Sequence, residues 1–153
     1  MKALLLLLIA LSSVAVADTP SKSAEAWVAA MTRGTTAPAL KKPLAFSVQS
    51  DRAECAKLAR GRASSPPELA TLKACFVATW AHVAKEATLV IEDIKLKDLD
   101  GDQLRFHKTA PKGTTWVRAS RSYAGQDLTI RIALDKDRTV LAVWFVYVEH
   151  DGE

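Results

Sequence analysis

The sequence predicts an α+β fold in which N-terminal helices pack on one face of a curved antiparallel sheet of four to five strands. Up to Glu86, most apolar residues recur at the three- and four-residue spacing of helices. After Glu86, apolar and polar residues alternate, which is the spacing of strands. Clusters of Gly, Pro, Asp and Lys separate the alternating segments at short intervals, as in an antiparallel meander. Helices followed by strands are expected to form separate layers.

The longest predicted helix runs from Ser65 to Glu86. Ser65 is a suitable N-cap, two prolines follow at the first helical positions, and Glu68 completes the pattern of a capping box. The apolar residues at helical spacing are Leu69, Leu72, Phe76 and Val83, with Cys75 and Trp80 beside them. This helix is expected to cover the strands that follow it.

The first 17 residues are typical of a cleaved signal peptide. Met1-Lys2 supplies positive charge, an apolar run follows, and Ala15-Val16-Ala17 forms the small-residue cleavage site. The apolar run is shorter than the roughly 20 residues that span a bilayer. We therefore expect a bacterial protein, secreted or periplasmic, with one mature α+β domain over residues 18–153 and no transmembrane segment.

Cys55 and Cys75 are the two cysteines of the chain, and both fall in the predicted mature domain. Export places them in an oxidising compartment, so the sequence predicts one disulfide. A redox or metal-binding pair is the alternative. It is disfavoured because the chain has no Cys-x-x-Cys and no histidine at ligand spacing from either cysteine.

The segments before the long helix predict two short helices and one strand. Ser23 to Met31 forms one helical face, which Gly34 terminates. Leu44 to Val48 alternates as a half-buried strand. Asp51 to Arg60 repeats the capping pattern and predicts a second helix ending at Gly61. Its short connection to the long helix predicts a helical hairpin that the disulfide would close.

The segments after the long helix predict the meander. The apolar phase changes within the first strand, which indicates a bulge near Glu92-Asp93. The last strand is apolar on both faces and is expected at the centre of the sheet. The predicted strands are 88–99, 104–108, 114–123, 128–134 and 140–148.

The architecture resembles the nuclear-transport-factor-2-like cone, a superfamily of small secreted binding proteins and ketosteroid-isomerase-like enzymes. The features that carry the resemblance are the helices before the meander, the bulged strand at Glu92-Asp93 and the long apolar strand Val140–Val148. The resemblance implies a curved sheet with a concave face. A cystatin-like sheet wrapped around a helix is the nearest alternative.

An aspartate cluster is the strongest metal-like pattern in the chain. Asp98, Asp100 and Asp102 surround Gly101, but a calcium loop needs glycine at its sixth position and glutamate at its twelfth. Here glycine is fourth, and Thr109 occupies the twelfth position. We interpret the cluster as a solvated hairpin turn, with a weak calcium site as the alternative, and expect no metal and no cofactor.

Composition and motifs narrow the function further. The net charge of +4 is far below the concentrated positive charge of nucleic-acid-binding proteins. The motifs of serine hydrolases, phosphate-binding loops and zinc proteases do not occur in the sequence. The sequence therefore favours binding over chemistry, and we expect no nucleic-acid partner.

We expect a non-catalytic binding or interaction domain whose concave sheet takes a small apolar ligand or an envelope protein. One alternative is a ketosteroid-isomerase-like enzyme that uses Asp93 or His107 with a tyrosine. Another is a cell-envelope structural protein that presents the basic residues of the strands, Arg105, Lys108, Lys112, Arg118, Arg121 and Arg131. The candidate ligand-binding residues are Asp93, His107, Tyr123, Trp144 and Tyr147.

Overall fold

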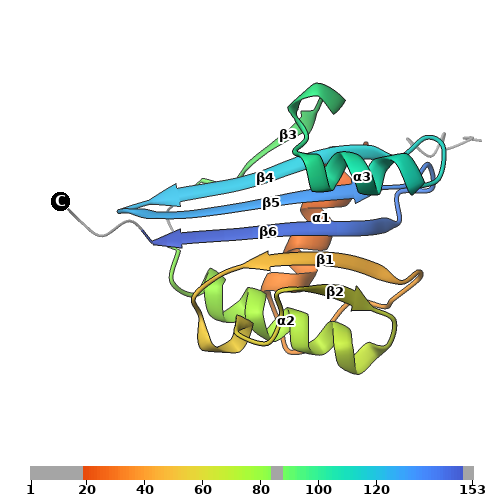
Figure 1. The fold of residues 1–153 in the computed structure, drawn as a ribbon. Coiled ribbons are helices and arrows are strands. Elements are labelled where there is room, and N and C mark those ends of the chain that lie inside the picture. Colours follow the sequence, from red (N-terminus) through yellow and green to blue (C-terminus); the bar gives the residue numbers. More distant parts are fainter. Residues whose placement is uncertain (1–18, 84–87, 150–153) are drawn as a thin grey trace, which may run out of the picture.

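The computed structural model describes residues 19–83 and 88–149, which form three α-helices, two short 3₁₀ turns and a six-stranded sheet (Figure 1). The helices are α1 (Pro20–Thr32), α2 (Pro66–Trp80) and α3 (Gly101–Thr109). The strands are β1 (Leu44–Gln49), β2 (Arg60–Ala63), β3 (Val90–Ile94), β4 (Thr115–Tyr123), β5 (Gln126–Leu134) and β6 (Val140–Glu149). The predicted signal peptide lies outside the described residues. So does Glu86, but the helix predicted to reach it ends earlier, since α2 stops at Trp80.

The α+β class is confirmed, and β3, β4, β5 and β6 form an antiparallel meander of four consecutive strands, as predicted. The expectation of a wholly antiparallel sheet of four to five strands is wrong, because β2 and β1 extend the meander to six strands. The sheet is mixed and open, with strand order β2-β1-β6-β5-β4-β3. β1 runs parallel to β6, and the other neighbouring strands are antiparallel. β6 is interior, as its apolar sequence predicted, because β1 and β5 flank it.

The helix predicted over Asp51–Arg60 is the largest error before α2. A 3₁₀ turn, η1 (Ala53–Cys55), forms there, and the chain then enters β2 as an edge strand beside β1. Gly61 does not terminate a helix but lies opposite Phe46, where a Cβ atom would come within 2.9 Å of the ring. Strand pairing and this close approach override the local helical pattern.

The start of α2 and the disulfide agree with the sequence. Ser65 is the N-cap, and its backbone N–H donates to the Glu68 carboxylate at 3.0 Å. Backbone N–H groups of Ser64 and Ser65 hold the pKa of Glu68 below its usual value. Cys55 and Cys75 form a disulfide. The predicted helical hairpin is absent, and the disulfide joins η1 to α2 instead.

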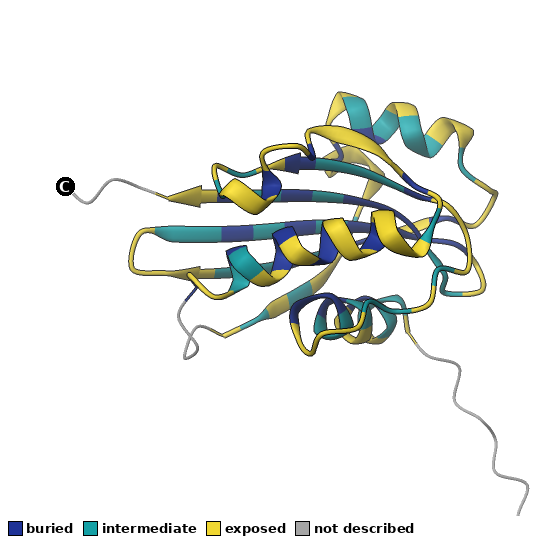
Figure 2. Ribbon diagram, turned by 90° about the horizontal axis from the view of Figure 1, so that it is seen from below, coloured by how far each residue is buried: buried dark blue, intermediate teal, exposed yellow. Residues whose placement is uncertain are grey.

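The main core lies between the sheet and helices α1 and α2. Figure 2 shows buried positions along the inner side of α2 and in the middle of the strands, with α1 and α3 on opposite sides of the sheet. Phe76 of α2 is fully buried and stacks on Phe145 of β6, with ring centroids 4.3 Å apart. The ring of Trp27 from α1 meets Phe76 edge-on at 5.8 Å.

Helix α3 replaces the turn predicted at Asp98–Asp102 and the strand predicted at Leu104–Lys108. Asp100 caps α3, because its carboxylate accepts from the Gln103 backbone N–H at 2.9 Å while the Gln103 side chain accepts from the Asp100 N–H. This reciprocal pair is a capping box. The 3₁₀ turn η2 (Leu96–Asp98) leads into it.

The bulge predicted at Glu92-Asp93 is also wrong. β3 pairs with β4 in unbroken register from Val90 to Ile94. The apolar phase changes because β3 contacts apolar clusters on both faces: Ile91 packs on the main core, whereas Ile94 packs on the cluster that contains Leu99 and Trp116. A regular strand that packs on both faces can thus imitate the sequence pattern of a bulge.

The turn between β5 and β6 is held by Asp135, whose side chain is 2% exposed. Its carboxylate accepts from Lys42 Nζ at 2.6 Å and from the backbone N–H groups of Asp137 and Thr139 at 2.8 and 3.0 Å. Burial alone would raise the pKa of Asp135, but these donors outweigh it and hold the pKa below the usual value.

We expect Asp135→Asn to lower the free energy of unfolding by about 2 kcal/mol at neutral pH, since hydrogen bonds to a charged group are lost. The depressed pKa means that Asp135 stabilises the fold above the unfolded-state pKa of about 3.9, and that this stabilisation disappears as the pH falls through the folded-state pKa. Urea denaturation from pH 7 to pH 3 should show the two proteins converging in acid. Asp137→Asn, in the exposed part of the same turn, serves as the control and should change little.

Candidate functional site: a groove on the open face of the sheet

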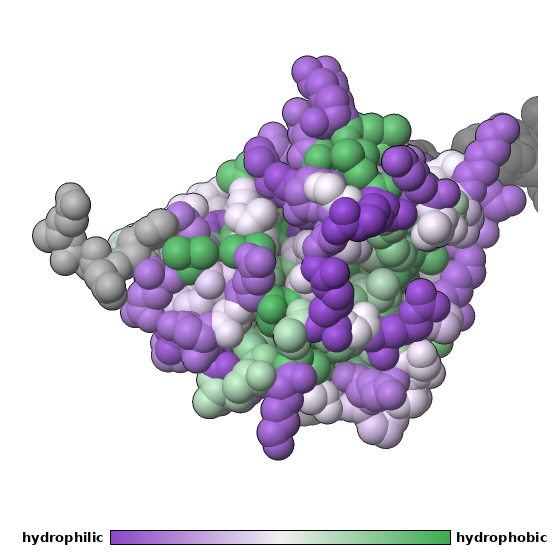
Figure 3. Space-filling model, in the orientation of Figure 1, coloured by the Kyte–Doolittle hydropathy of each residue, from purple (hydrophilic) through white to green (hydrophobic). Residues whose placement is uncertain are grey.

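The face of the sheet opposite α1 and α2 is only partly covered. α3 packs across the end of this face near Trp116 and Ala142, where a small second core forms. Beyond α3, the strands present alternate side chains to solvent. Figure 3 looks onto this face and shows apolar and weakly polar surface interspersed with hydrophilic side chains.

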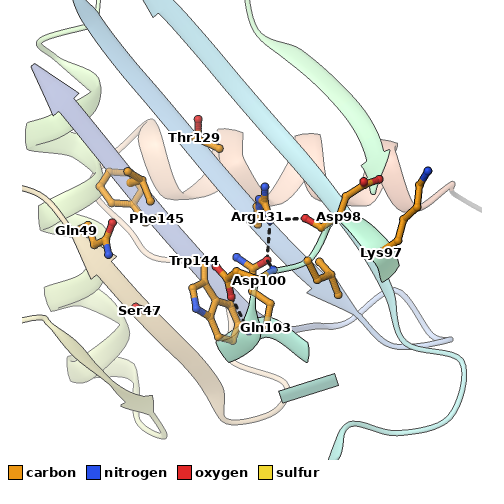
Figure 4. A pocket seen from close by; sticks show the side chains of 12 residues that line it. Ser47, Gln49, Lys97, Asp98, Asp100, Gln103, Thr129, Arg131, Trp144 and Phe145 are labelled. Atoms are coloured by element: carbon orange, nitrogen blue, oxygen red, sulfur yellow. Dashed lines mark hydrogen bonds between the residues drawn. The ribbon is translucent and has the colours of Figure 1, made fainter. Parts of the chain in front are cut away.

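A groove of about 470 Å³ lies on this face between the strands and the segment that contains η2 and the start of α3. β1, β6 and β5 form its floor, and residues 97–103 form one wall. Figure 4 shows the side chains of the residues that line the groove, which are Ser47, Gln49, Lys97, Asp98, Leu99, Asp100, Gln103, Thr129, Arg131, Trp144, Phe145 and Val146. The ring of Phe145 itself belongs to the main core on the other face. The groove is large enough for a small organic ligand.

Trp144 supplies the aromatic part of the floor, and other rings hold it in place. Its ring lies 5.6 Å from that of Phe106 on α3 and 5.4 Å from that of Trp116 on β4. The indole Nε1 of Trp144 is buried and has no hydrogen-bond partner among the described residues, whereas Nε1 of Trp116 donates to His107 Nδ1 at 3.2 Å. Packing between α3 and the sheet therefore fixes the orientation of Trp144.

Arg131 supplies the positive charge on the floor. It projects from β5, and its Nη1 donates to the backbone oxygen of Asp98 at 3.0 Å and to Gln103 Oε1 at 2.7 Å (Figure 4). Both acceptors are uncharged groups. Gln103 is 2% exposed and held by the capping box, so it provides a rigid support for the guanidinium. The arginine is consequently fixed in direction while its charge stays free of a carboxylate partner among the described residues.

A second hollow, of about 340 Å³, adjoins the groove and shares Arg131 and Asp98 with it. Arg118 lies directly across from Arg131 in the pairing of β4 with β5. Two arginines in this position would repel each other. Glu92 of β3 offsets this repulsion for Arg118, since its Oε1 accepts from Arg118 Nε at 2.8 Å and also from Nη2.

The charges that line the groove balance. Lys97 and Arg131 are positive, while Asp98 and Asp100 are negative. Asp100 is engaged as the N-cap of α3, and Asp98 offers its backbone oxygen to Arg131. A balanced groove with one fixed arginine suits a small ligand of low charge better than a polyanion.

No family model matches the chain, and comparison with curated proteins and with solved structures gives no match.

The predicted ligand-binding residues do not form one site. Asp93 and His107 line a separate pocket of about 640 Å³ near the start of β4. Asp93 is exposed and accepts a hydrogen bond from the Ser21 hydroxyl at 3.1 Å. His107 lies on α3, not on a strand, and its Nδ1 is occupied by Trp116. Trp144 alone among the predicted residues lines the groove.

The two predicted tyrosines lie elsewhere. Tyr123 is 50% exposed at the end of β4. Tyr147 is buried in the main core on the helix side of the sheet, where its hydroxyl accepts from Arg52 Nη2 at 2.6 Å. Trp144 and Tyr147 are three residues apart in one strand, so they occupy opposite faces.

The basic residues of the second half of the chain do not share a face either. Arg118 and Arg131 lie on the open face, and Arg105 and Lys108 lie on α3. Arg121 lies on the helix side, where its guanidinium covers the Trp80 ring at 4.2 Å from the centroid. Burial and the nearby charge of Arg33 lower the pKa of Arg121.

The aspartate cluster is spread over η2 and α3. Asp100 caps α3, and Asp102 pairs with Arg60 and Arg105. The pKa of Asp102 is lowered chiefly by the hydrogen bond from Arg105. Among the described residues no three His, Cys, Asp or Glu side chains are arranged to hold a metal ion. The interpretation as a hairpin turn is wrong, because the segment starts a helix.

Gln103 was not predicted as a site residue, and Arg131 was predicted only as part of a general basic surface. A signal for Gln103 was present, since Asp100 and Gln103 have the spacing of a capping box. A signal for Arg131 was its place on the polar side of the strictly alternating strand, next to Thr129. Neither signal reveals that the two side chains meet.

Proposed function

We propose that the protein is a non-catalytic binding domain and that its ligand is a small organic molecule bound in the groove on the open face of the sheet. The observation that carries this proposal is the groove itself, which combines a fixed aromatic side chain, Trp144, with a fixed arginine, Arg131. Small-molecule sites are typically concave, with apolar walls and a few well-placed polar groups that orient the ligand.

The lining supports binding without catalysis. Serine, threonine and glutamine side chains surround the floor and offer hydrogen bonds at neutral charge. Of the two residues considered for proton transfer, His107 lines the separate pocket, and Asp93 lines that pocket and the second hollow, but neither lines the groove. Binding is therefore the activity for which the groove has suitable groups.

The cellular setting forms part of the same proposal. A disulfide is typical of proteins in oxidising compartments, which supports secreted or periplasmic residence after removal of the predicted signal peptide. Among the described residues, no helix is long and apolar enough to cross a membrane. A relationship to nuclear-transport-factor-2-like or cystatin-like proteins remains a prediction of the sequence analysis.

Titration of ¹⁵N-labelled protein with benzyl alcohol, benzamide and benzoate at millimolar concentration tests the proposal. We expect amide shifts centred on Ser47, Thr129 and Val146 for at least one of the three probes. Thr129→Trp and Gln49→Trp each fill part of the groove from a different strand, and each should abolish these shifts.

The matched control is Thr71→Trp, which places the same side chain on the exposed side of α2. It should leave the shifts unchanged. Shifts centred on α1 or α2, or the absence of shifts with all three probes, would exclude the groove as the binding site.

A further inference from the structure

Only part of the hydrogen-bonding capacity of the Arg131 guanidinium is used. Both hydrogens of Nη1 are engaged, one with the backbone oxygen of Asp98 and the other with Gln103 Oε1. Among the described residues no group accepts a hydrogen bond from Nε or Nη2, and neither nitrogen is buried. These two nitrogens form one edge of the guanidinium, with two parallel N–H groups.

The neighbouring arginine shows what such an edge binds. Arg118 lies across the strand pair from Arg131 and uses its Nε and Nη2 to bind the Glu92 carboxylate. The corresponding edge of Arg131 has no carboxylate in the described part of the chain. The two arginines therefore lie on one strand pair and one face of the sheet, but only Arg118 has a carboxylate bound to this edge within the described residues.

From this contrast we infer that the groove binds a monocarboxylate, with the carboxylate on the Nε–Nη2 edge of Arg131 and the apolar part of the ligand beside Trp144 and Val146. This inference rests on the proposed function and specifies its ligand class. Paired N–H groups of a guanidinium match the two oxygens of a carboxylate, and such bonds are shorter and stronger than neutral ones.

The surrounding charges favour a single negative charge. Asp98 and Asp100 line the same groove as Arg131 and would repel a ligand with several negative charges. The apolar part of the ligand is required because a lone exposed ion pair contributes little to binding. Trp144 and Val146 supply the apolar surface next to the arginine.

The decisive comparison is benzoate against benzamide, which have the same ring and nearly the same shape. We expect the wild-type protein to bind benzoate at least about tenfold more tightly than benzamide, as measured by NMR titration of groove amides. Arg131→Gln should bring the ratio of the two affinities close to one, chiefly by weakening benzoate binding. Benzamide shifts that stay centred on the groove amides in this variant would show that the groove still binds.

Two further variants separate the paired hydrogen bonds from charge. Arg131→Lys keeps the charge but loses the two parallel N–H groups, and should also lose most of the preference. Lys97→Gln removes the same charge from the groove wall as Arg131→Gln does from the floor, and should change benzoate binding less than about threefold.

The source of the carboxylate is tested with Gly-Gly-Phe carrying a free or an amidated C-terminus. Tight binding of the free-acid peptide would indicate a peptide terminus as ligand, whereas binding of benzoate alone would indicate a free small acid. Equal affinity of the groove for benzoate and benzamide would overturn the carboxylate inference while leaving the proposed function intact. Failure of every probe to bind in the groove would instead overturn the proposed function.

Discussion

Replacing both cysteines with alanine should lower the free energy of unfolding by roughly 3 kcal/mol, since the unfolded chain regains the freedom of the loop that the disulfide closes. Cys55 and Cys75 are separated by 20 positions, and both are buried, at 3% and 0% exposure. The bond also holds η1 against α2, the element with which η1 makes its closest packing. Urea denaturation monitored by circular dichroism measures the loss.

The control for this experiment is a reducing agent. Dithiothreitol present throughout unfolding should destabilise the wild-type protein by a similar amount and leave the Cys55→Ala/Cys75→Ala protein unchanged. A loss below about 1 kcal/mol in the double variant would mean that the turn at η1 is held by packing rather than by the covalent bond.

Phe76→Ala should have the largest effect of any single substitution considered, a loss of about 3–5 kcal/mol in the free energy of unfolding. Phe76 is fully buried at the centre of the main core, where it contacts Phe145 of the sheet and Trp27 of α1. Its removal leaves a cavity. The rings of Phe145 and Trp27 belong to two different elements and cannot fill this cavity without leaving their present positions. Thermal and urea denaturation both measure this loss.

Phe106→Ala is the matched control on the other side of the sheet. Phe106 is only half-buried, and it packs on Trp116 and Trp144 beneath α3. We expect a loss of about 1–2 kcal/mol. Equal losses for the two variants would contradict the assignment of the main core to the side of α1 and α2.

Elements with complete local signals were predictable. The start of α2 is specified by Ser65, the following prolines and Glu68 within four consecutive residues. The strand alternation from Leu128 to Leu134 places its apolar residues on the core side of β5, as expected. In both cases the deciding interactions lie within the element or between it and a large apolar layer.

Elements decided by distant partners were not predictable. β2 becomes a strand because β1 offers its edge, and β1 itself pairs with β6 from the other end of the chain. The same applies to the groove, because Gln103 meets Arg131 only after α3 has folded over the open face. A local pattern cannot report a contact that the tertiary structure creates.

The segment Asp98–Lys108 shows an intermediate case. Asp100 and Gln103 carried a capping signal, but the neighbouring aspartates and Gly101 also fit a turn. Within this segment alone, the helix and the turn differ little in free energy. Burial of Gln103 and the packing of Phe106 on two tryptophans decide in favour of the helix.

The parallel pairing of the first and last strands has a consequence for the order of folding. Ala45 of β1 lies beside Ala142 of β6, so β1 cannot form the hydrogen bonds of this edge until almost the whole chain has been synthesised. Contacts between such distant residues slow folding. A nascent chain that stops before Val140, and so lacks β6, can therefore form the β1–β2 hairpin and the three-stranded sheet of β3, β4 and β5, but it has no strand to join the two.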